Sequence, residues 1–374
     1  MSKQLYESLM ALIDETNPSG FYFVDQTNEV GSKVRIFGYY VVSYSDWLKE
    51  NALEARGIMF NIDDEEKPVL LCRPMKKYFN LNENPFTLNL NMSKLALLMD
   101  KADGSLVSFY SDKNILLCKT KMNCHSEQAI VAKSLILNVN YADLYERVKE
   151  LTQKGYTVNF EYVGPDHRVV LFYPEQKLIL LNIRDNETGE YVPYHEIYAD
   201  GVLRKYLVPS VDLKTVNARS FVRDTLRLTN TEGYVGILQD GTWFKLKTRW
   251  YSTLHKTKED LMTREKTLVA IANGVYDDLY SLVSSDSEKA YLDKALKIFT
   301  GFLDESIKKL NLLYSQNRGL ERKEFAINGQ NELRDQMYLF HVYMKMFDGL
   351  EMDKLVDVLT QTFIKHVDQF KEQL

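Results

Sequence analysis

The stretch "DKADGSLVSFY", from Asp100 to Tyr110, places Lys101 two residues before an Asp-Gly pair and a strand-like run. Asp-Gly is typical of turns, and short apolar runs between turn residues are typical of strands. Because helices intervene only occasionally up to about Trp250, the pattern predicts an antiparallel α+β domain. The strand-like runs are "KVRIFGYYVVSY", "ARGIMFNI", "PVLLCRP", "SLVSFY", "NILLCKT", "YTVNFEYV", "RVVLFY", "KLILLNIR", "GYVGILQ" and "TWFKLKT".

The periodicity changes after Thr253. A capping-box candidate, Ser285 with Glu288, precedes apolar residues spaced by three and four, which predicts an amphipathic helix. Residues 338–347 and 355–370 behave similarly. We therefore predict an α+β domain over residues 1–253 and an all-α domain over residues 254–374. The spaced apolar residues are Leu292, Leu296, Phe299, Leu303, Ile307, Leu310 and Leu313.

The composition excludes several classes of protein. The 374 residues carry a net charge of −5, so a site for a polyanion must be a local basic surface. No apolar run approaches the roughly 20 residues that span a bilayer, and the N-terminus lacks the pattern of a signal peptide. Three sparse cysteines are typical of a reducing cytoplasm.

Several common nucleotide and metal motifs are missing from the sequence. There is no G-x-G-x-x-G, no G-x-x-x-x-G-K-[ST] and no H-E-x-x-H, and Cys118, Cys124 and His125 lack zinc-finger spacing. If the protein binds a nucleotide, side chains other than a glycine-rich phosphate loop must hold it.

Lys101 is the candidate nucleophile. An amine near its usual pKa of about 10.4 is protonated at neutral pH, so nearby cations or a metal would have to lower that pKa. Lys245 and Lys247, two apart in "TWFKLKT", would project from one face of a strand while Phe244 and Leu246 face the core. The same pattern, taken alone, also fits an edge strand with solubilising lysines.

Other charged groups occur in the predicted strands and loops. Arg56 lies in "LEARGIMF" and Lys77 in "CRPMKKYFN", where the alternative is a charged loop. Glu161 interrupts the apolar strand "NFEYV", and Glu232 precedes the strand "GYVGIL". A glutamate in such a run faces either water or a polar cleft.

The ordered set K-x-D-G, "NFEYVGP", "EGYVGI" and "FKLK" resembles the motifs of the covalent nucleotidyltransferases, which are ATP-dependent DNA and RNA ligases and mRNA capping enzymes. The closer resemblance is to RNA ligase 1 of T-even bacteriophages and covers essentially the whole chain. It rests on segments such as "SYSDWL", "ALEARGIMF", "RPMKKYFNLNENPFT", "DGSLVS", "SEQA" and "NETGEY". K-x-D-G alone is weakly specific, whereas the ordered set is highly specific.

The resemblance implies a three-step sealing of RNA ends. Lys101 attacks the α-phosphate of ATP, the AMP passes to a 5′-phosphate, and a 3′-hydroxyl displaces the AMP. By this resemblance the catalytic residues are Lys101, Asp103, Gly104, Glu161, Lys245 and Lys247. The residues that bind the nucleotide further include Tyr39, Arg56, Lys77, Phe79, Lys121, Glu232 and Gly233.

These implied roles are physically reasonable. Lys245 and Lys247 would bind the triphosphate and lower the pKa of Lys101 by like-charge repulsion. Gly104 would let the backbone approach the nucleotide closely. A divalent cation, Mg²⁺, is implied by the charge of the phosphates, with Asp277 and Asp278 as the metal position. An acidic pair that opens a helix explains these two aspartates equally well.

The resemblance also implies a partner and leaves alternatives open. It implies a cytoplasmic monomer in an infected bacterial host that repairs tRNA nicked in its anticodon loop, with the helical domain recognising the tRNA. DNA ligases and capping enzymes carry a β-barrel after the "FKLK" strand, where this chain is helical, and a non-catalytic RNA-binding relative is a third alternative. One departure affects Lys121: the family segment "K-S-K-G-S" reads "KTKMN" here.

Overall fold

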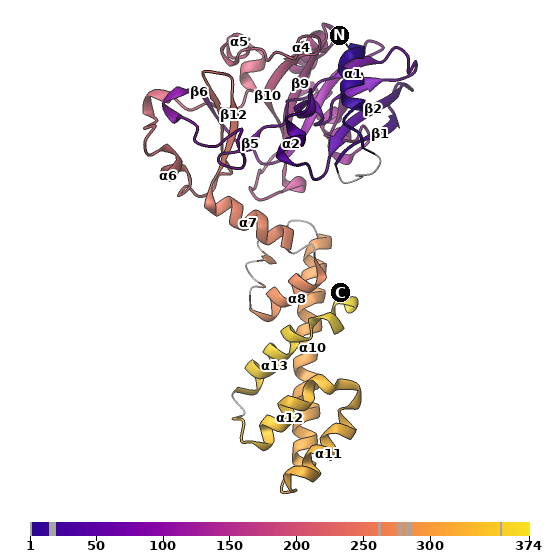
Figure 1. Cartoon of the computed structure of the whole chain (residues 1–374), viewed down its shortest axis with the longest axis vertical. Coiled ribbons are helices and arrows are strands. Elements are labelled where there is room, and N and C mark those ends of the chain that lie inside the picture. Colours follow the sequence, from indigo (N-terminus) through magenta and orange to yellow (C-terminus); the bar gives the residue numbers. More distant parts are fainter. Residues whose placement is uncertain are drawn as a thin grey trace. The chain divides into compact units, whose positions relative to one another are not determined.

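The computed structural model describes residues 2–14, 20–260, 263–274, 276, 279–280, 283, 286–351 and 354–374. The chain forms two compact units, Met1–Ser252 and Thr253–Leu374 (Figure 1). In the described part of the chain, no helix is both long enough and apolar enough to cross a membrane.

The described residues of the first unit form three four-stranded sheets. The first has the order β1 (Phe21–Thr27), β2 (Lys33–Tyr39), β3 (Met59–Asn61) and β4 (Val69–Cys72). The second has the order β10 (Lys177–Asp185), β9 (Tyr156–Val163), β7 (Ser105–Asp112) and β8 (Ile115–Lys119). The third has the order β5 (Phe79–Asn80), β12 (Trp243–Lys247), β11 (Gly233–Leu238) and β6 (Leu95–Asp100).

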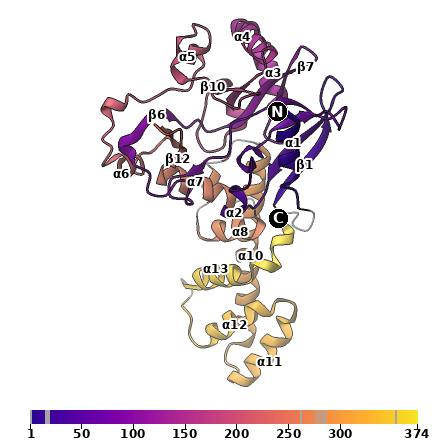
Figure 2. The same ribbon diagram turned by 45° about the horizontal axis from the view of Figure 1, so that its top comes forward.

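Most strand pairs in these sheets are antiparallel, and β5 runs parallel to β12. Helices α3 (Glu127–Ile136) and α4 (Ala142–Gln153) lie against the second sheet (Figure 2). The spacing of Leu144, Val148 and Leu151 on α4 follows the helical period, so one apolar face is buried on that sheet. The shorter helices of this unit are α1 (Ser2–Met10), α2 (Tyr44–Trp47), α5 (Tyr194–Ala199) and α6 (Phe221–Thr225).

The second unit is helical. It follows α7 (Arg249–Asp260), which crosses the boundary between the units, and contains α8 (Arg264–Ala272), α10 (Asp286–Asn317), α11 (Arg322–Glu332), α12 (Phe340–Phe347) and α13 (Leu355–Lys365). Leu292, Phe299 and Leu310 of α10 are buried in its core, while Leu296 and Leu303 are partly buried. Ser285, the expected cap of α10, lies outside the described residues. The architecture confirms the predicted α+β fold with antiparallel sheets and a helical C-terminal region.

Some strand predictions were wrong in detail. "RVVLFY", residues 168–173, is not a strand, because the backbone N–H groups of Val170 and Leu171 donate to Asp103 at 2.8 and 2.6 Å instead of to a neighbouring strand. Strand β2 ends at Tyr39, well before the end of its predicted run. Strands β1 and β6 were not among the predicted runs.

Candidate active site

Lys101 follows the last residue of β6, and its backbone is fixed beside the start of β11. Its N–H donates to the carbonyl of Gly233 at 2.9 Å, and its Nζ lies 2.8 Å from Oε2 of Glu232. The other oxygen of Glu232, Oε1, lies 3.1 Å from Nζ of Lys247. The Glu232 side chain is only 2% exposed. A single buried carboxylate therefore holds the predicted nucleophile and one lysine of the "FKLK" strand side by side.

The electrostatic environment of Lys101 differs from the prediction. Burial alone would lower the pKa of Lys101, but the carboxylates of Glu232 and Glu161 outweigh burial and raise it. The expected depression of this pKa by Lys245 and Lys247 was wrong, because Glu232 lies between Lys101 and Lys247. Lys101 is therefore an ammonium ion that contacts a carboxylate, and it must lose a proton before its nitrogen can act as a nucleophile.

Glu161 is the second carboxylate of the site. It lies on β9, and its Oε1 accepts a hydrogen bond from the backbone N–H of Gly104 at 3.0 Å. Removal from water raises the pKa of Glu161 to about 7, and Glu232 adds to this effect while Lys101 and Arg56 oppose it. Glu161 therefore exchanges a proton near neutral pH, and nearby positive charge favours its ionised form.

Two lysines lie beside the ring of Tyr39 at the end of β2. Nζ of Lys121 lies 4.1 Å and Nζ of Lys77 lies 5.2 Å from the centre of the Tyr39 ring. Burial, together with repulsion from Arg56, Lys77 and Lys119, lowers the pKa of Lys121 to about 8. We call Arg56, Lys77, Lys121 and Lys245 the cationic cluster.

Lys245 is the most strongly perturbed member of this cluster. Burial first, and then repulsion from Lys77, Arg56 and Lys101, lowers its pKa to about 7. Its neighbours Phe244 and Leu246 are buried, so the alternation along β12 directs Lys245 and Lys247 away from the apolar side as the sequence predicts. Glu83 offsets this repulsion only in part, and a bound polyphosphate would neutralise the remaining positive charge.

Asp103 occupies a different environment from the other predicted residues. It is buried, its Oδ2 accepts the N–H groups of Val170 and Leu171, and its Oδ1 accepts the hydroxyl of Tyr251 at 2.7 Å. The ring centre of Tyr251 lies 5.0 Å from Nζ of Lys247. Asp103 thus ties the segment around residue 170 to the start of α7, and its carboxylate is fully engaged within the protein.

Two predicted glycines are explained by close backbone contacts. A Cβ on Gly104 would lie 2.2 Å from the carbonyl oxygen of Tyr162. A Cβ on Gly233, where φ is +128°, would lie 2.0 Å from the carbonyl oxygen of Leu246. Glycine is therefore needed at both positions by strand packing, whereas we expected Gly104 to make room for a nucleotide.

The remaining predicted residues are placed as follows. Phe79 stacks on Phe86 with ring centres 5.3 Å apart, and Nζ of Lys77 lies 4.9 Å from its ring. Asp277 and Asp278 lie outside the described residues. Within the described ranges, no group of three or more His, Cys, Asp or Glu side chains could hold a metal ion. Glu161 and Glu232 are the carboxylates beside Lys101.

Sequence reasoning missed several residues that shape the site. Tyr78, whose ring centre lies 5.0 Å from Nζ of Lys245, directly follows Lys77 in the sequence and was not among the predicted site residues. Glu54 is 3% exposed and contacts both Arg73 and Arg184. The buried Lys119 donates to the backbone carbonyls of Thr120 and Lys121 at 3.0 and 3.1 Å. A buried ion pair between residues 130 positions apart leaves no local signal in a single sequence.

Comparison with solved structures gives only distant resemblances. An archaeal ATP-dependent RNA ligase aligns over 80% of this chain and 80% of its own, with 15% identity and a TM-score of 0.46. A variant of Naegleria gruberi RNA ligase solved with ATP and Mn aligns over 43% of this chain with 16% identity and a TM-score of 0.35. That match spans 51% of the Naegleria chain, about half its length.

Sequence comparisons are more extensive. A candidate RNA ligase of Thermovibrio ammonificans is 26% identical over 307 residues, which are 79% of this chain and 78% of the relative. The family model described as RNA ligase matches residues 54–258, which include Lys101, Glu161, Glu232, Lys245 and Lys247. The model described as T4 RNA ligase 1, C-terminal domain, matches residues 258–373. The chain therefore belongs to the family of RNA ligases that includes T4 RNA ligase 1.

Proposed function

We propose that this RNA ligase uses ATP and joins 5′-phosphate and 3′-hydroxyl ends through a lysyl-AMP on Lys101. The observation that carries the proposal is the placement of Lys101. Its ammonium group contacts the buried Glu232 at 2.8 Å, and Lys101 itself contributes to the low pKa of Lys245 in the cationic cluster. A nucleophile, a proton acceptor and a polyphosphate site therefore adjoin one another, as nucleotidyl transfer requires.

The first step follows from this arrangement. The cationic cluster binds the β- and γ-phosphates of ATP and leaves the α-phosphorus facing Lys101. One Nζ proton passes along the 2.8 Å contact to Glu232, and the nitrogen lone pair forms a P–N bond while the bond between the α-phosphorus and the bridging oxygen breaks. The new P–N bond acidifies the nitrogen, which releases a second proton to solvent and becomes the neutral phosphoramidate nitrogen. Pyrophosphate leaves with its charge neutralised by Lys77, Lys245 and Arg56.

A divalent cation fits the donor groups of the site. Mg²⁺ in phosphoryl-transfer sites is held by one or two carboxylates together with phosphate oxygens and water. Glu161, whose Oε1 bonds the Gly104 N–H, retains its second oxygen for such a role, and a bound cation would also favour its ionised form. The cation would neutralise phosphate charge, while Lys101 and Glu232 carry the proton transfer.

Incubation with ATP labelled at the α-phosphate tests the proposal directly. We expect covalent label on the protein, released by hydroxylamine at acidic pH as a phosphoramidate would be. Unlabelled protein under conditions that support RNA joining would show that the AMP is not carried on a protein side chain. Protein that neither takes label nor joins RNA would overturn the proposed catalysis and favour a binding role.

The pKa of Lys245 predicts how ATP affinity depends on pH. With its pKa lowered to about 7, Lys245 in the free protein is charged below pH 7 and becomes neutral as pH rises. We expect the Kd for ATP to rise several-fold between pH 6.5 and 8.5, while Lys245→Arg stays charged and shows a flatter profile. Equilibrium binding is measured with an ATP analogue that has a methylene group in place of the α,β-bridging oxygen, so that no adduct forms and Lys101 stays in place.

The Lys245→Arg protein is the control for other groups that titrate in this pH range, such as Glu161. The Glu161 pKa of about 7 affects both proteins equally, so only the difference between their profiles reports on Lys245. Identical pH profiles for the two proteins would show that Lys245 does not carry its charge to the triphosphate.

We propose further that residues 1–253 form the adenylyltransferase domain and that residues 254–374 select tRNA. In the second unit, Lys308, Arg318 and Lys323 are exposed, while Arg322 pairs with Asp348 and Lys309 donates to Gln336 at 2.9 Å. Lys308 lies in the last third of α10, Arg318 directly follows α10, and Lys323 lies in the first turn of α11, where they could contact phosphate backbone.

Replacing Lys308, Arg318 and Lys323 by Gln should weaken binding of nicked tRNA. Each lost phosphate contact should reduce the slope of log K against log salt concentration by about one. The matched control replaces Lys345, Lys354 and Lys365, three lysines of the same unit, and should retain the wild-type slope. If both triple variants lose equal affinity, net charge rather than this surface is responsible.

A further inference from the structure

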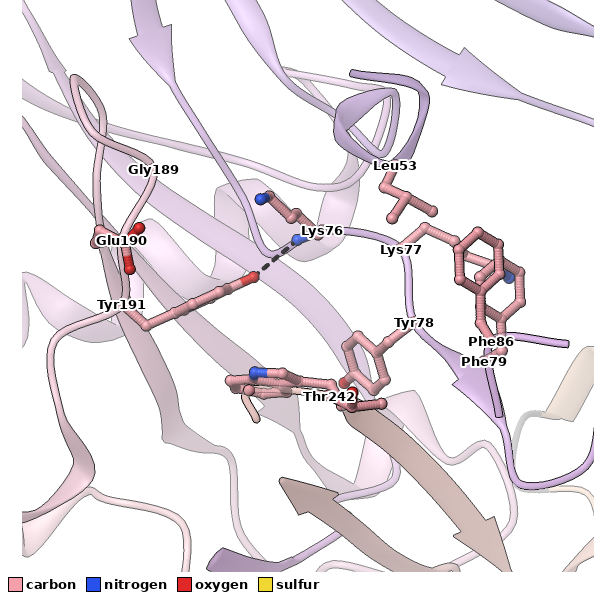
Figure 3. A pocket seen from close by; sticks show the side chains of 12 residues that line it. Leu53, Lys76, Lys77, Tyr78, Phe79, Phe86, Gly189, Glu190, Tyr191 and Thr242 are labelled. Atoms are coloured by element: carbon pink, nitrogen blue, oxygen red, sulfur yellow. Dashed lines mark hydrogen bonds between the residues drawn. The ribbon is translucent and has the colours of Figure 1, made fainter. Parts of the chain in front are cut away.

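An aromatic pocket is lined in part by Tyr78, whose ring centre lies 5.0 Å from Nζ of Lys245. It has a volume of about 430 Å³, within the range of ligand sites, and Tyr78, Tyr191 and Trp243 contribute aromatic rings to its lining. The Trp243 ring centre lies 5.5 Å from that of Tyr78 and 4.9 Å from that of Tyr191. Figure 3 shows Tyr191 and Tyr78 on two sides of the pocket, with Lys76 beside it.

The pocket is built on rigid parts of the first unit. The hydroxyl of Tyr191 accepts the backbone N–H of Lys76 at 3.0 Å, drawn as a dashed line in Figure 3. The Arg184 guanidinium lies 5.1 Å from the Tyr191 ring centre and is fixed by Glu54 and by the carbonyls of Pro74 and Gly189. The aromatic surface is therefore preorganised, and its three rings are only half-buried.

The pocket adjoins the phosphate site at its Lys77 end. Lys77 belongs to both the pocket lining and the cationic cluster. Tyr78 also lines the pocket, and its ring centre lies 5.0 Å from Nζ of Lys245 in the cluster. Figure 3 shows the Lys77 side chain directed towards Phe79 and Phe86, away from Tyr191. A nucleotide whose phosphate sits on the cluster can thus place its base among the pocket rings.

The chemistry of the two transfer steps identifies that nucleotide. In-line displacement requires pyrophosphate to leave the α-phosphorus opposite Nζ of Lys101. In the next step Lys101 is the leaving group, so the attacking 5′-phosphate of RNA must also lie opposite Lys101. The RNA 5′-phosphate therefore takes the place on the cationic cluster that pyrophosphate has vacated. The ribose O5′ of the AMP is an equatorial substituent in both displacements, so the adenosine extends to the side of the axis that joins Lys101 to the pyrophosphate position.

Resting on the proposed lysyl-AMP function, we propose that the Tyr78, Tyr191 and Trp243 pocket binds the base of the 5′-terminal nucleotide of the RNA whose phosphate is activated. Aromatic rings stack on every base, so the pocket tolerates different 5′-terminal bases. Lys76 at its margin and Lys77 at its inner end hold the adjoining phosphate.

The test measures binding of a 5′-phosphorylated pentaribonucleotide with a 3′-fluorophore by fluorescence anisotropy, which requires no covalent step. Removing the base from the first nucleotide should raise the Kd of the wild-type protein about 5- to 150-fold. Trp243→Ala should raise the Kd for the intact RNA by a similar factor. It should raise the Kd for the abasic RNA very little further, because the substitution and the missing base remove the same stacking contact. Trp243→Phe should recover part of the affinity, and Tyr198→Ala, which removes an exposed aromatic outside the pocket, should match wild type.

Three outcomes would overturn this assignment. The first is a wild-type protein that binds the abasic RNA as tightly as the intact RNA. The second is that the rise in Kd caused by Trp243→Ala and the rise caused by base removal multiply when the two are combined. The third is that Trp243→Ala raises the ATP concentration needed for self-adenylylation by the same factor as the Kd for RNA. The last would place the adenine of ATP in the pocket instead. A wild-type protein that takes no label from ATP would instead refute the proposed function, and the binding comparison would still show whether the pocket holds an RNA base.

Discussion

Lys101→Ala is expected to abolish covalent labelling by ATP, while the variant still joins chemically adenylylated RNA. The variant lacks the amine that attacks the α-phosphate, but the adenylylated end bypasses that step. Lys101→Arg should be equally unable to take label, because a guanidinium stays protonated. The measurement is covalent label per mole of protein beside the rate of sealing of the adenylylated RNA.

The matched control is Lys119→Ala, another lysine of this unit that lies in the motif segment after the nucleophile. Lys119 bonds two backbone carbonyls, so its loss should affect folding rather than the site of labelling. Folded Lys119→Ala should therefore still take label. Residual labelling of Lys101→Ala at the wild-type level would place the nucleophile elsewhere.

Glu54→Gln is expected to lower the free energy of unfolding by about 3–5 kcal/mol, as for the loss of one partner in a buried ion pair. The two oxygens of Glu54 accept hydrogen bonds of 2.7 Å from Arg184 and 2.9 Å from Arg73, and all three side chains are at most 9% exposed. Glutamine keeps the shape of the side chain but leaves two guanidinium groups without their counter-charge.

Tryptophan fluorescence during urea unfolding measures this effect. The three tryptophans, Trp47, Trp243 and Trp250, all lie in the first unit and so report its unfolding. Glu150→Gln on α4 serves as the control, because the Glu150 carboxylate forms its ion pairs with Arg147 and Lys154 at the solvent-exposed surface. This substitution should leave the urea midpoint close to that of the wild type. A wild-type midpoint for Glu54→Gln would mean that the buried network is energetically neutral.

The fold class could be predicted from the sequence because its signals are local. The alternation of Phe244 and Leu246 with two lysines marks β12, and the steps of three and four after residue 286 mark α10. The strand predicted at residues 168–173 was wrong for a non-local reason. The apolar composition of this segment suits a strand, but the side chain of Asp103, about 70 residues away, accepts hydrogen bonds from the backbone N–H groups of the segment.

Sequence motifs point to the residues of the candidate site, but they do not predict the pKa shifts within it. The motifs identified Lys101, Glu161, Glu232, Lys245 and Lys247, and the structure brings these residues into one site. Which lysine loses its proton most readily depends on which carboxylate contacts which amine. Glu232 contacts Lys101 and Lys247, whereas at Lys245 burial and repulsion from Lys77, Arg56 and Lys101 outweigh the attraction of Glu83, and no spacing rule expresses that choice. The aromatic pocket was missed because Tyr78, Tyr191 and Trp243 come from three separate segments.

Mapping the covalent adduct is the most direct test of the account. After reaction with ATP labelled at the α-phosphate, protease digestion and mass spectrometry locate the AMP on a single peptide. The account predicts that the AMP is attached to Nζ of Lys101 in the peptide around "DKADGS". Attachment to Lys119, Lys121, Lys245 or Lys247, or an AMP distributed over several lysines, would contradict it.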